Sequence, residues 1–147
     1  MPPVYDAVTC RGVLNDMITD QERQSAVRSL VRSLAPGGSL FLDVRAEPGS
    51  RERVDGAPRS RQVALGAGVE LAFTARTTWS QGMLHVEEQY DLVRPGTPTQ
   101  RSSYFFTMRP WTEAELRTVL HASGLRDVEV TVGVGRRTPD RFFVVAS

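Results

Sequence analysis

Apolar positions near the start of the chain follow two different periods. Residues 4–10 form a short apolar run with few polar positions, which is typical of a strand covered on both faces. From Asp20 the apolar side chains recur at helical spacing, with arginines on the opposite face. The apolar set is Ala26, Val27, Leu30, Val31 and Leu34, and the arginines are Arg23, Arg28 and Arg32. Since Thr19 or Asp20 can cap such a helix, the pattern predicts a strand followed by a capped helix.

A second apolar strand follows a glycine turn. The sequence Pro36-Gly37-Gly38 predicts the end of the helix, and residues 39–44 (SLFLDV) form the next apolar run. Strand, helix and strand joined in this way make a βαβ unit, whose crossover is almost always right-handed. Residues 1–45 are therefore expected to belong to an α/β sheet.

The middle of the chain has a different composition and a different pattern of apolar residues. Residues 46–60 are rich in Arg, Glu, Pro and Gly, which is typical of a mobile surface loop. Four antiparallel strands are predicted beyond it, separated by Gly, Pro and Ser turn signals. They are expected at 61–65, 69–79, 83–93 and 100–108. We therefore expect 46–109 to be a loop and an antiparallel β-meander with one face covered and one in water.

The last part returns to the α/β pattern. Thr112 and Glu115 form a capping box that opens a helix ending at Gly124. Residues 127–132 and 141–146 predict two closing strands, joined by a polar connection. The whole chain, 1–147, is thus expected to be a single α/β domain. Its sheet and helices come from 1–45 and 110–147, and the meander is an insertion.

Composition narrows the range of partners. The chain has 147 residues, 40% of them apolar and 24% charged, with a net charge of +1. This balance does not suggest nucleic acid or an anionic membrane as partner, and no apolar run approaches the ~20 residues that cross a bilayer. The one cysteine, Cys10, excludes an internal disulfide and agrees with a reducing, cytoplasmic location. No group of His, Cys and Asp has metal-ligand spacing, so no metal is expected.

Polar residues gather directly after the first two strands. Arg11, Gly12, Asn15 and Asp16 follow the first strand, and Asp43 and Arg45 close the second. In open α/β sheets, ligands bind outside the carboxyl ends of the strands. These residues are therefore candidates for a site. The alternatives are a helix-entry turn, where Asn and Asp are common, and a surface ion pair worth little.

Four segments together carry a resemblance to a known family. They are YDAVTCRGVLND (5–16), SLAPGGSLFLDVR (33–45), RPWTEAELRTVLHASGL (109–125) and DRFFVVAS (140–147). In this order and spacing they resemble the second half of a class I S-adenosylmethionine-dependent methyltransferase. The resemblance implies a partial Rossmann-like sheet, containing the last four strands of the order 3-2-1-4-5-7-6. It also implies that the meander is a lid over a small-molecule substrate.

The resemblance also implies roles for individual residues. The backbone of Cys10, Arg11 and Gly12 would line the methionine part of S-adenosylmethionine. Asp16 would serve as a base where the acceptor needs one. The expected substrate contacts are Asn15, Asp43, Arg45, Tyr104 and Arg109. For Phe105 and Phe106, and for Trp79 and Trp111, packing is the expected role, and Cys10 is expected to be a buried strand residue rather than a nucleophile.

The glycine-rich loop of the family is not found. Gly66-Ala67-Gly68 and Gly133-Val134-Gly135 lie between strands and precede no helix, so they are expected to be turns. The chain is therefore expected to lack the cofactor-binding half of the fold. The strand at 4–10 would then be an unpaired edge, which favours dimerisation or strand swapping with a second chain.

The expected function is methyl transfer from S-adenosylmethionine to a small molecule, with the missing half supplied separately. Alignment of the acceptor and exclusion of water would do most of the catalysis. One alternative is a non-catalytic binding or assembly module that dimerises through the strand at 4–10. Another treats the meander as an independent cup for a small ligand.

Overall fold

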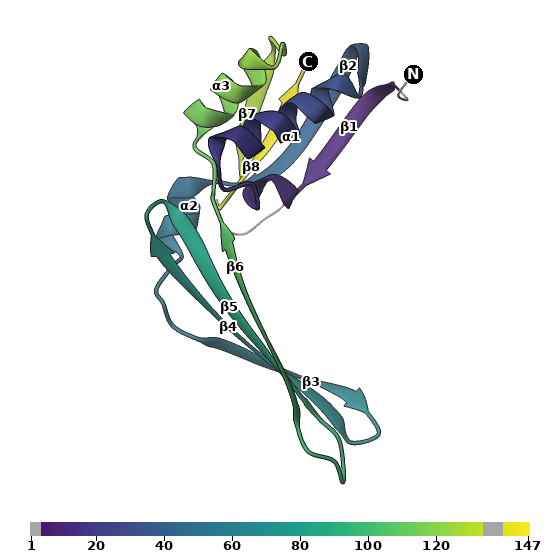
Figure 1. Ribbon diagram of the computed structural model, residues 1–147, viewed down its shortest axis with the longest axis vertical. Coiled ribbons are helices and arrows are strands. Elements are labelled where there is room, and N and C mark those ends of the chain that lie inside the picture. Colours follow the sequence, from purple (N-terminus) through teal and green to yellow (C-terminus); the bar gives the residue numbers. More distant parts are fainter. Residues whose placement is uncertain (1–3, 134–139) are drawn as a thin grey trace. The chain divides into compact units, whose positions relative to one another are not determined.

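The computed structural model, which describes residues 4–133 and 140–147, separates the chain into two units (Figure 1). The first unit is Met1–Arg53 with Met108–Ser147, and the second is Val54–Thr107. The sequence predicted a single domain in which the insertion begins at residue 46 and ends at residue 109. Val134 and Gly135, which belong to one predicted turn, lie outside the described residues.

The first unit is built on a four-stranded mixed sheet. Its strands are β1 (Tyr5–Arg11), β2 (Leu34–Arg45), β8 (Arg141–Ala146) and β7 (Val128–Val132), in the order β1-β2-β8-β7. β1 is parallel to β2, whereas β8 is antiparallel to both of its neighbours. This is the 4-5-7-6 part of the predicted order, so the partial Rossmann-like fold is confirmed.

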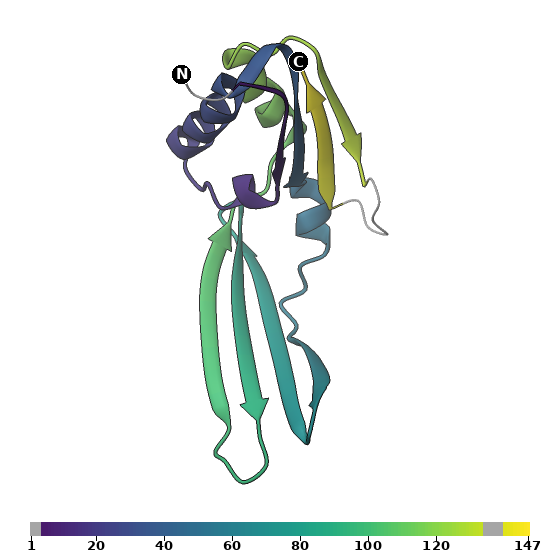
Figure 2. The same ribbon diagram turned by 90° about the vertical axis from the view of Figure 1, so that its right-hand side faces the viewer.

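Two helices cover one face of this sheet, as Figure 2 shows. They are α1 (Asp20–Arg32) and α3 (Glu113–Ala122), and both begin with a complete capping box, at Thr19 and Thr112. The core lies between these helices and the sheet. Its fully buried members include Val27, Leu40, Leu42, Val44, Trp111, Leu116, Leu120 and Val144.

β1 is an outer and largely exposed strand, as the expected unpaired edge at 4–10 implied, although its apolar run alone favoured cover on both faces. Five of its seven residues are exposed, and only Val8 and Cys10 are partly buried against the core. The reason is positional, because β1 is the outer strand of the sheet among the described residues. An apolar run with few polar positions therefore marks a strand, but it does not reveal which of its neighbours are present.

The region of the glycine turn also differs from the prediction. The helix ends at Arg32, and β2 already begins at Leu34, before Pro36-Gly37-Gly38. Gly38 lies where β1 and β2 approach closely. A Cβ there would stand 3.0 Å from the carbonyl oxygens of Tyr5 and Asp6. Because real Cβ contacts are rarely so short, glycine allows this strand pairing.

A short helix was missed. α2 (Glu47–Glu52) occupies the start of the segment predicted as a mobile loop. Six residues that include Pro48 and Gly49 have little intrinsic helix propensity. The chain just before it is held by tertiary bonds, since the Ala46 N–H donates to the Asp140 carbonyl (2.9 Å) and Glu47 N–H to the Trp111 carbonyl (2.9 Å).

The second unit is the predicted meander. Its strands are β3 (Arg59–Gly66), β4 (Val69–Ser80), β5 (Met83–Val93) and β6 (Gln100–Met108), hydrogen-bonded in chain order. All four predicted strands are confirmed to within two residues. The expected packing role of Phe105 and Phe106 is wrong, because these side chains are 74% and 39% exposed.

Candidate functional site

The turn after β1 is fixed by glycine and by the neighbouring strand. Gly12 has φ 78°, a left-handed conformation that L side chains rarely adopt, and it opens the short 3₁₀ helix η1 (Val13–Asn15). The Gly12 N–H donates to the Asp43 carbonyl at 2.8 Å. The ends of β1 and β2 are thereby joined at one place, as the sequence predicted for their polar residues.

Asn15 is buried in this turn, and its side chain hydrogen-bonds to backbone on both sides. Its Nδ2 donates to the Gly12 carbonyl (2.8 Å), and its Oδ1 accepts from the Arg45 N–H (2.8 Å). Both ends of the amide are thus engaged by backbone. Substrate contact by Asn15 stays a prediction, whereas its positioning of the turn against β2 is directly visible.

Asp43 lies between two arginines. Arg11 Nε is 3.2 Å from Asp43 Oδ2, and Arg141 Nε donates to the other carboxylate oxygen. Arg141 also donates to the Asp43 carbonyl at 3.1 Å. The sequence reasoning missed Arg141. The signal was available in the predicted order of strands, because the start of an antiparallel β8 must lie beside the end of β2.

These residues border a groove of about 350 Å³ in the first unit. It is lined by Thr9, Cys10, Arg11, Phe41, Leu42, Asp43, Arg141 and Phe143. Partial burial raises the pKa of the Cys10 thiol, opposed by a hydrogen bond from the Leu14 backbone. Cys10 therefore remains a thiol at neutral pH, which agrees with the expectation that it is not a nucleophile.

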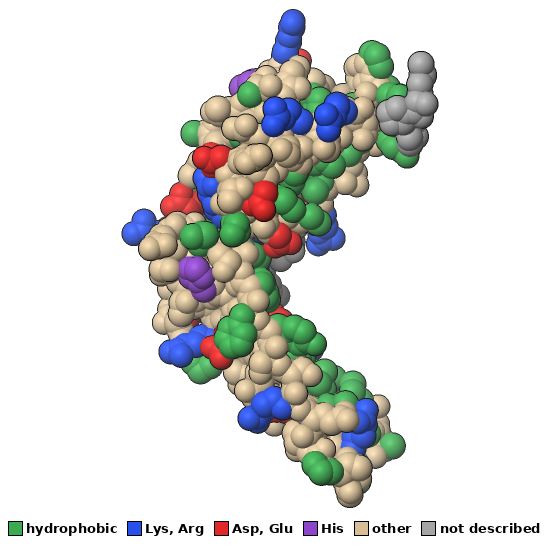
Figure 3. All heavy atoms as spheres, in the orientation of Figure 1, with side chains coloured by type: hydrophobic (Ala, Val, Ile, Leu, Met, Phe, Trp, Pro, Cys, Tyr) green, Lys and Arg blue, Asp and Glu red, His purple; other side chains and the backbone are tan. Residues whose placement is uncertain are grey.

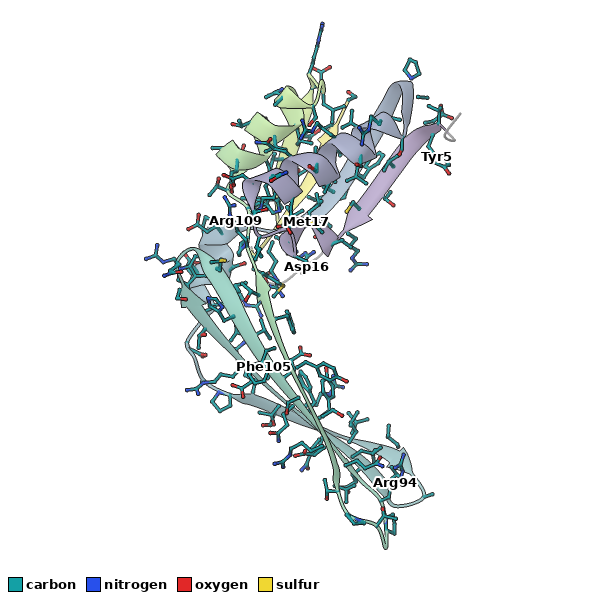
Figure 4. The ribbon with its side chains drawn as sticks, in the orientation of Figure 1. Tyr5, Asp16, Met17, Arg94, Phe105 and Arg109 are labelled. Atoms are coloured by element: carbon teal, nitrogen blue, oxygen red, sulfur yellow. The ribbon has the colours of Figure 1, made fainter. Side chains whose placement is uncertain are left out.

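Asp16 is exposed at the end of η1, and Figure 4 shows it beside Met17 in the turn after β1. Its carboxylate makes no hydrogen bond or ion pair within 4–133 and 140–147. Arg109 also lies at this turn, because its N–H donates to the Asn15 carbonyl (2.8 Å). Asp16 is the open acidic group of this site.

The Arg109 guanidinium is already engaged. It pairs with Asp20 (2.6 Å) and with Glu115, and it donates to the Ile18 carbonyl (3.1 Å). These contacts join the start of α1 to the start of α3. Its contact with substrate stays a prediction.

Arg23 is a buried cation that the sequence placed on the solvent face of α1. Its side chain is 1% exposed and stacks on the Trp111 ring, 3.9 Å from the centroid. It donates to Glu115 (3.1 Å) and to the carbonyl oxygens of Met17 (2.9 Å) and Pro110 (3.1 Å). Burial lowers the pKa of Arg23 to about 10, opposed by the Glu115 carboxylate, so it stays charged at neutral pH.

A second buried ion group lies at the end of β2. Asp140, which is buried, pairs with Arg45 (3.4 Å) and with Arg53. The predicted substrate residue Arg45 is therefore part of a link between β2, the end of α2 and the start of β8. Asp140 had been assigned only to a polar connection.

Tyr104 belongs to the second unit. It is 55% exposed and meets the Tyr90 ring edge-on, with centroids 5.8 Å apart. It remains a predicted substrate contact. In the same unit, His85 contacts the hydroxyls of Ser80 (2.8 Å) and Thr107 (3.2 Å).

The groove carries charges of both signs. A methionine moiety, with its ammonium and carboxylate, would meet Asp43, Arg11 and Arg141 there, which pair with one another in this structure. Substrate contact by Asp43 stays a prediction. The described part of the chain contains no cluster of three or more possible metal ligands. It also contains no helix with the length and apolar character needed to span a membrane.

Comparison with known proteins gives similarity at the level of structure. No family model and no curated protein matches the sequence. Among solved structures, the sugar N-methyltransferase KedS8 from Streptoalloteichus sp ATCC 53650 is 26% identical, with a TM-score of 0.84 over 98% of this chain. DesVI of Streptomyces venezuelae is 23% identical, with a TM-score of 0.77 over 98% of this chain. The amino pentose methyltransferase CalS10 from Micromonospora echinaspora is 24% identical, with a TM-score of 0.77 over 99% of this chain.

The shared region is only part of those proteins. This chain spans 56% of KedS8, 58% of DesVI and 59% of CalS10. The chain therefore has part of the Rossmann-like fold of S-adenosylmethionine-dependent methyltransferases.

Proposed function

We propose that this chain contributes to S-adenosylmethionine-dependent N-methylation of a small molecule, with an amine on a sugar as acceptor. One observation carries the proposal. The turn from Cys10 to Asp16 is held against the end of β2, in a fold similar to KedS8 at a TM-score of 0.84. The sugar N-methyltransferase activity of KedS8 supports the acceptor class.

In this proposal the groove residues bind the cofactor and orient the acceptor. The backbone of Cys10, Arg11 and Gly12 forms a wall for the methionine moiety, and Arg11 and Arg141 hold the carboxylate of Asp43 beside this wall. S-adenosylmethionine supplies an activated methyl group on a sulfonium. Asp16 would accept a hydrogen bond from the acceptor amine and take the proton that the nitrogen gives up on methylation. Asn15, Asp43, Arg45 and Arg109 of the first unit help to place the acceptor. Tyr104, in the second unit, stays a predicted substrate contact.

We propose that the rest of the cofactor site comes from a segment outside these 147 residues. The sequence offers no strand, glycine-rich loop and helix in succession. The segment would be encoded upstream in frame or by a separate chain. We propose that methyl transfer depends on it.

The test is cofactor binding and turnover with and without that segment. We expect no heat on titration of S-adenosylmethionine into the 147-residue chain alone. We expect binding, and mass-spectrometric methylation of amino sugars but not of their hydroxyl counterparts, once the upstream-encoded segment is present. Asp16→Asn should lower kcat by about 10²-fold or more, and Asp127→Asn, an exposed carboxylate before β7, serves as control.

Tight binding to the chain alone would contradict the dependence on a second segment. Methylation of hydroxyl but not amine acceptors would contradict the acceptor class. An unchanged kcat in Asp16→Asn would remove its role as base, without touching the rest of the proposal.

A second candidate function is an assembly module that pairs through β1. The exposure of β1 at the edge of the sheet favours it, since open edges accept further strands. Ala7→Lys places a charge on this edge and should abolish such pairing in sedimentation experiments. A dimer that persists in Ala7→Lys would exclude β1 as its interface.

A further inference from the structure

The turn that follows β1 is held in two halves. The first half, residues 12–15, is bound to β2. The Gly12 N–H donates to the Asp43 carbonyl at 2.8 Å. Asn15 Oδ1 accepts from the Arg45 N–H, also at 2.8 Å. The wall proposed above for the methionine moiety is therefore fixed by bonds to the neighbouring strand.

The second half of the turn is bound by two arginines instead. Arg23 Nε, on α1, donates to the Met17 carbonyl at 2.9 Å. Arg109 Nη1, from the segment before α3, donates to the Ile18 carbonyl at 3.1 Å. Both carbonyl oxygens come directly after Asp16 in the chain, so the arginines fix the backbone on which this carboxylate stands. Figure 4 labels Asp16, Met17 and Arg109 at the same end of the first unit.

One carboxylate joins the two arginines. Glu115 Oε2 pairs with Arg23 Nη1 at 3.1 Å, and Glu115 Oε1 accepts from Arg109 Nη2. A guanidinium as buried as that of Arg23, whose side chain is 1% exposed, requires an opposite charge and a full set of acceptors. The exposed Asp20 adds a second carboxylate to Arg109 at 2.6 Å, and Figure 3 shows acidic and basic side chains at the surface over the starts of α1 and α3. Glu115 thus sets where both guanidinium groups lie.

The capping box of α3 does not by itself explain this arrangement. The box engages Glu115 Oε2 through the Thr112 N–H at 3.5 Å, a long contact. Glu113 lies in the same first turn of α3 and pairs with Arg117 along that helix, at 2.8 Å. An acidic residue at this helix start can therefore be satisfied locally, whereas Glu115 reaches two arginines from other parts of the chain.

We propose that Glu115 is a positioning residue for Asp16. Its carboxylate fixes Arg23 and Arg109, and these two side chains fix the backbone that follows Asp16. The role of Asp16 as proton acceptor rests on the proposed function, whereas the position of the turn is a property of the chain alone.

The first test is amide hydrogen exchange in the chain alone, comparing Glu115→Gln with Glu113→Gln. Glutamine keeps the length of the side chain and an acceptor for the capping box, but it turns an amide N–H toward one guanidinium and removes the charge. We expect the amides of Asp16 and Arg109, which donate to carbonyl oxygens of the turn, to exchange at least about tenfold faster in Glu115→Gln. Amides shared by β7 and β8 should keep their rates, and Glu113→Gln should change neither region.

A milder variant guards against loss of folding. Asp20→Asn removes the exposed carboxylate from Arg109 and leaves Glu115 in place. We expect the same two amides to exchange faster than in the unchanged chain, but by a smaller factor than in Glu115→Gln. Circular dichroism checks that each variant is folded.

The second test is methyl transfer with the completing segment proposed above. Glu115→Gln should lower kcat by about tenfold or more, because a displacement of about 1 Å at a catalytic group can cost about a hundredfold in rate. The KM for S-adenosylmethionine should stay unchanged, since the first half of the turn is bound to β2. The double variant Asp16→Asn with Glu115→Gln should be no slower than Asp16→Asn alone, because Glu115 acts through Asp16.

Three results would overturn the proposal. They are equal exchange at the two amides in Glu115→Gln and Glu113→Gln, acceleration that extends evenly to β7 and β8, and losses in kcat that add in the double variant. An unchanged protein that transfers no methyl group would contradict the proposed function instead. The exchange rates would then still decide whether Glu115 holds the turn.

Discussion

At the scale of single residues, buried charge holds the first unit together. Arg23 stacks on Trp111 and satisfies Glu115 and the carbonyl oxygens of Met17 and Pro110. Arg23→Ala would leave these groups unpaired, so we expect a loss of about 3–5 kcal/mol in the free energy of unfolding. Denaturant unfolding measures it, with Arg28→Ala, exposed on the same helix, expected to stay within about 0.5 kcal/mol. Equal effects of the two substitutions would contradict the buried role of Arg23.

Cys10 gives a prediction that depends on pH. Burial raises the pKa of its thiol, and only the thiolate reacts with alkylating reagents. We therefore expect the alkylation rate of the folded chain to have its midpoint above the ordinary thiol value. The measurement is unambiguous because Cys10 is the one cysteine in the sequence. A midpoint below that value would show a reactive thiol and would contradict the role of Cys10 as a strand residue.

The residues that sequence reasoning missed share a physical reason. Helical spacing assigned Arg23 to the solvent face together with Arg28 and Arg32. The spacing shows which residues share a face of the helix, but it does not show which other element packs on that face. Arg141 and Asp140 became significant only through pairing of β8 with β2. By contrast, Gly12, Asn15 and Asp43 were predicted to meet, since consecutive parallel strands end at the same edge.

At the scale of elements, the start of a helix is determined by a few neighbouring residues, so a single substitution can test it. In α3 the Thr112 hydroxyl accepts from the Glu115 N–H at 3.1 Å. Thr112→Ala should cost about 1 kcal/mol in the free energy of unfolding. Thr118→Ala, exposed within the same helix, should be neutral or slightly stabilising, because alanine is the better helix former. Loss of stability in both variants would indicate a general effect of threonine rather than capping.

Elements were predictable where the signal was local. Both capping boxes, the βαβ order and the four meander strands follow from caps, turns and alternation. The presence of α2 did not, because this helix depends on what lies beside it in space. α2 follows backbone bonds to Asp140 and Trp111, which are distant in sequence.

At the scale of the whole molecule, the sheet of the first unit has two unequal faces. Helices α1 and α3 cover one, whereas Phe41, Asp43 and Phe143 lie on the other and line the groove. Along β8 the burial alternates, so that Phe142 is buried while Phe143 is only partly buried. A segment that completes the cofactor site would therefore pack on the face that carries Phe143.

This alternation provides a paired experiment on adjacent residues. In the chain alone, Phe142→Ala should cost about 3 kcal/mol or more in the free energy of unfolding, because it opens a cavity in the core. Phe143→Glu should cost much less, since its face is not covered by described residues. If the proposed completing segment is supplied, Phe143→Glu should abolish S-adenosylmethionine binding in calorimetry while the chain stays folded. Unchanged binding in Phe143→Glu would show that the completing segment does not use this face.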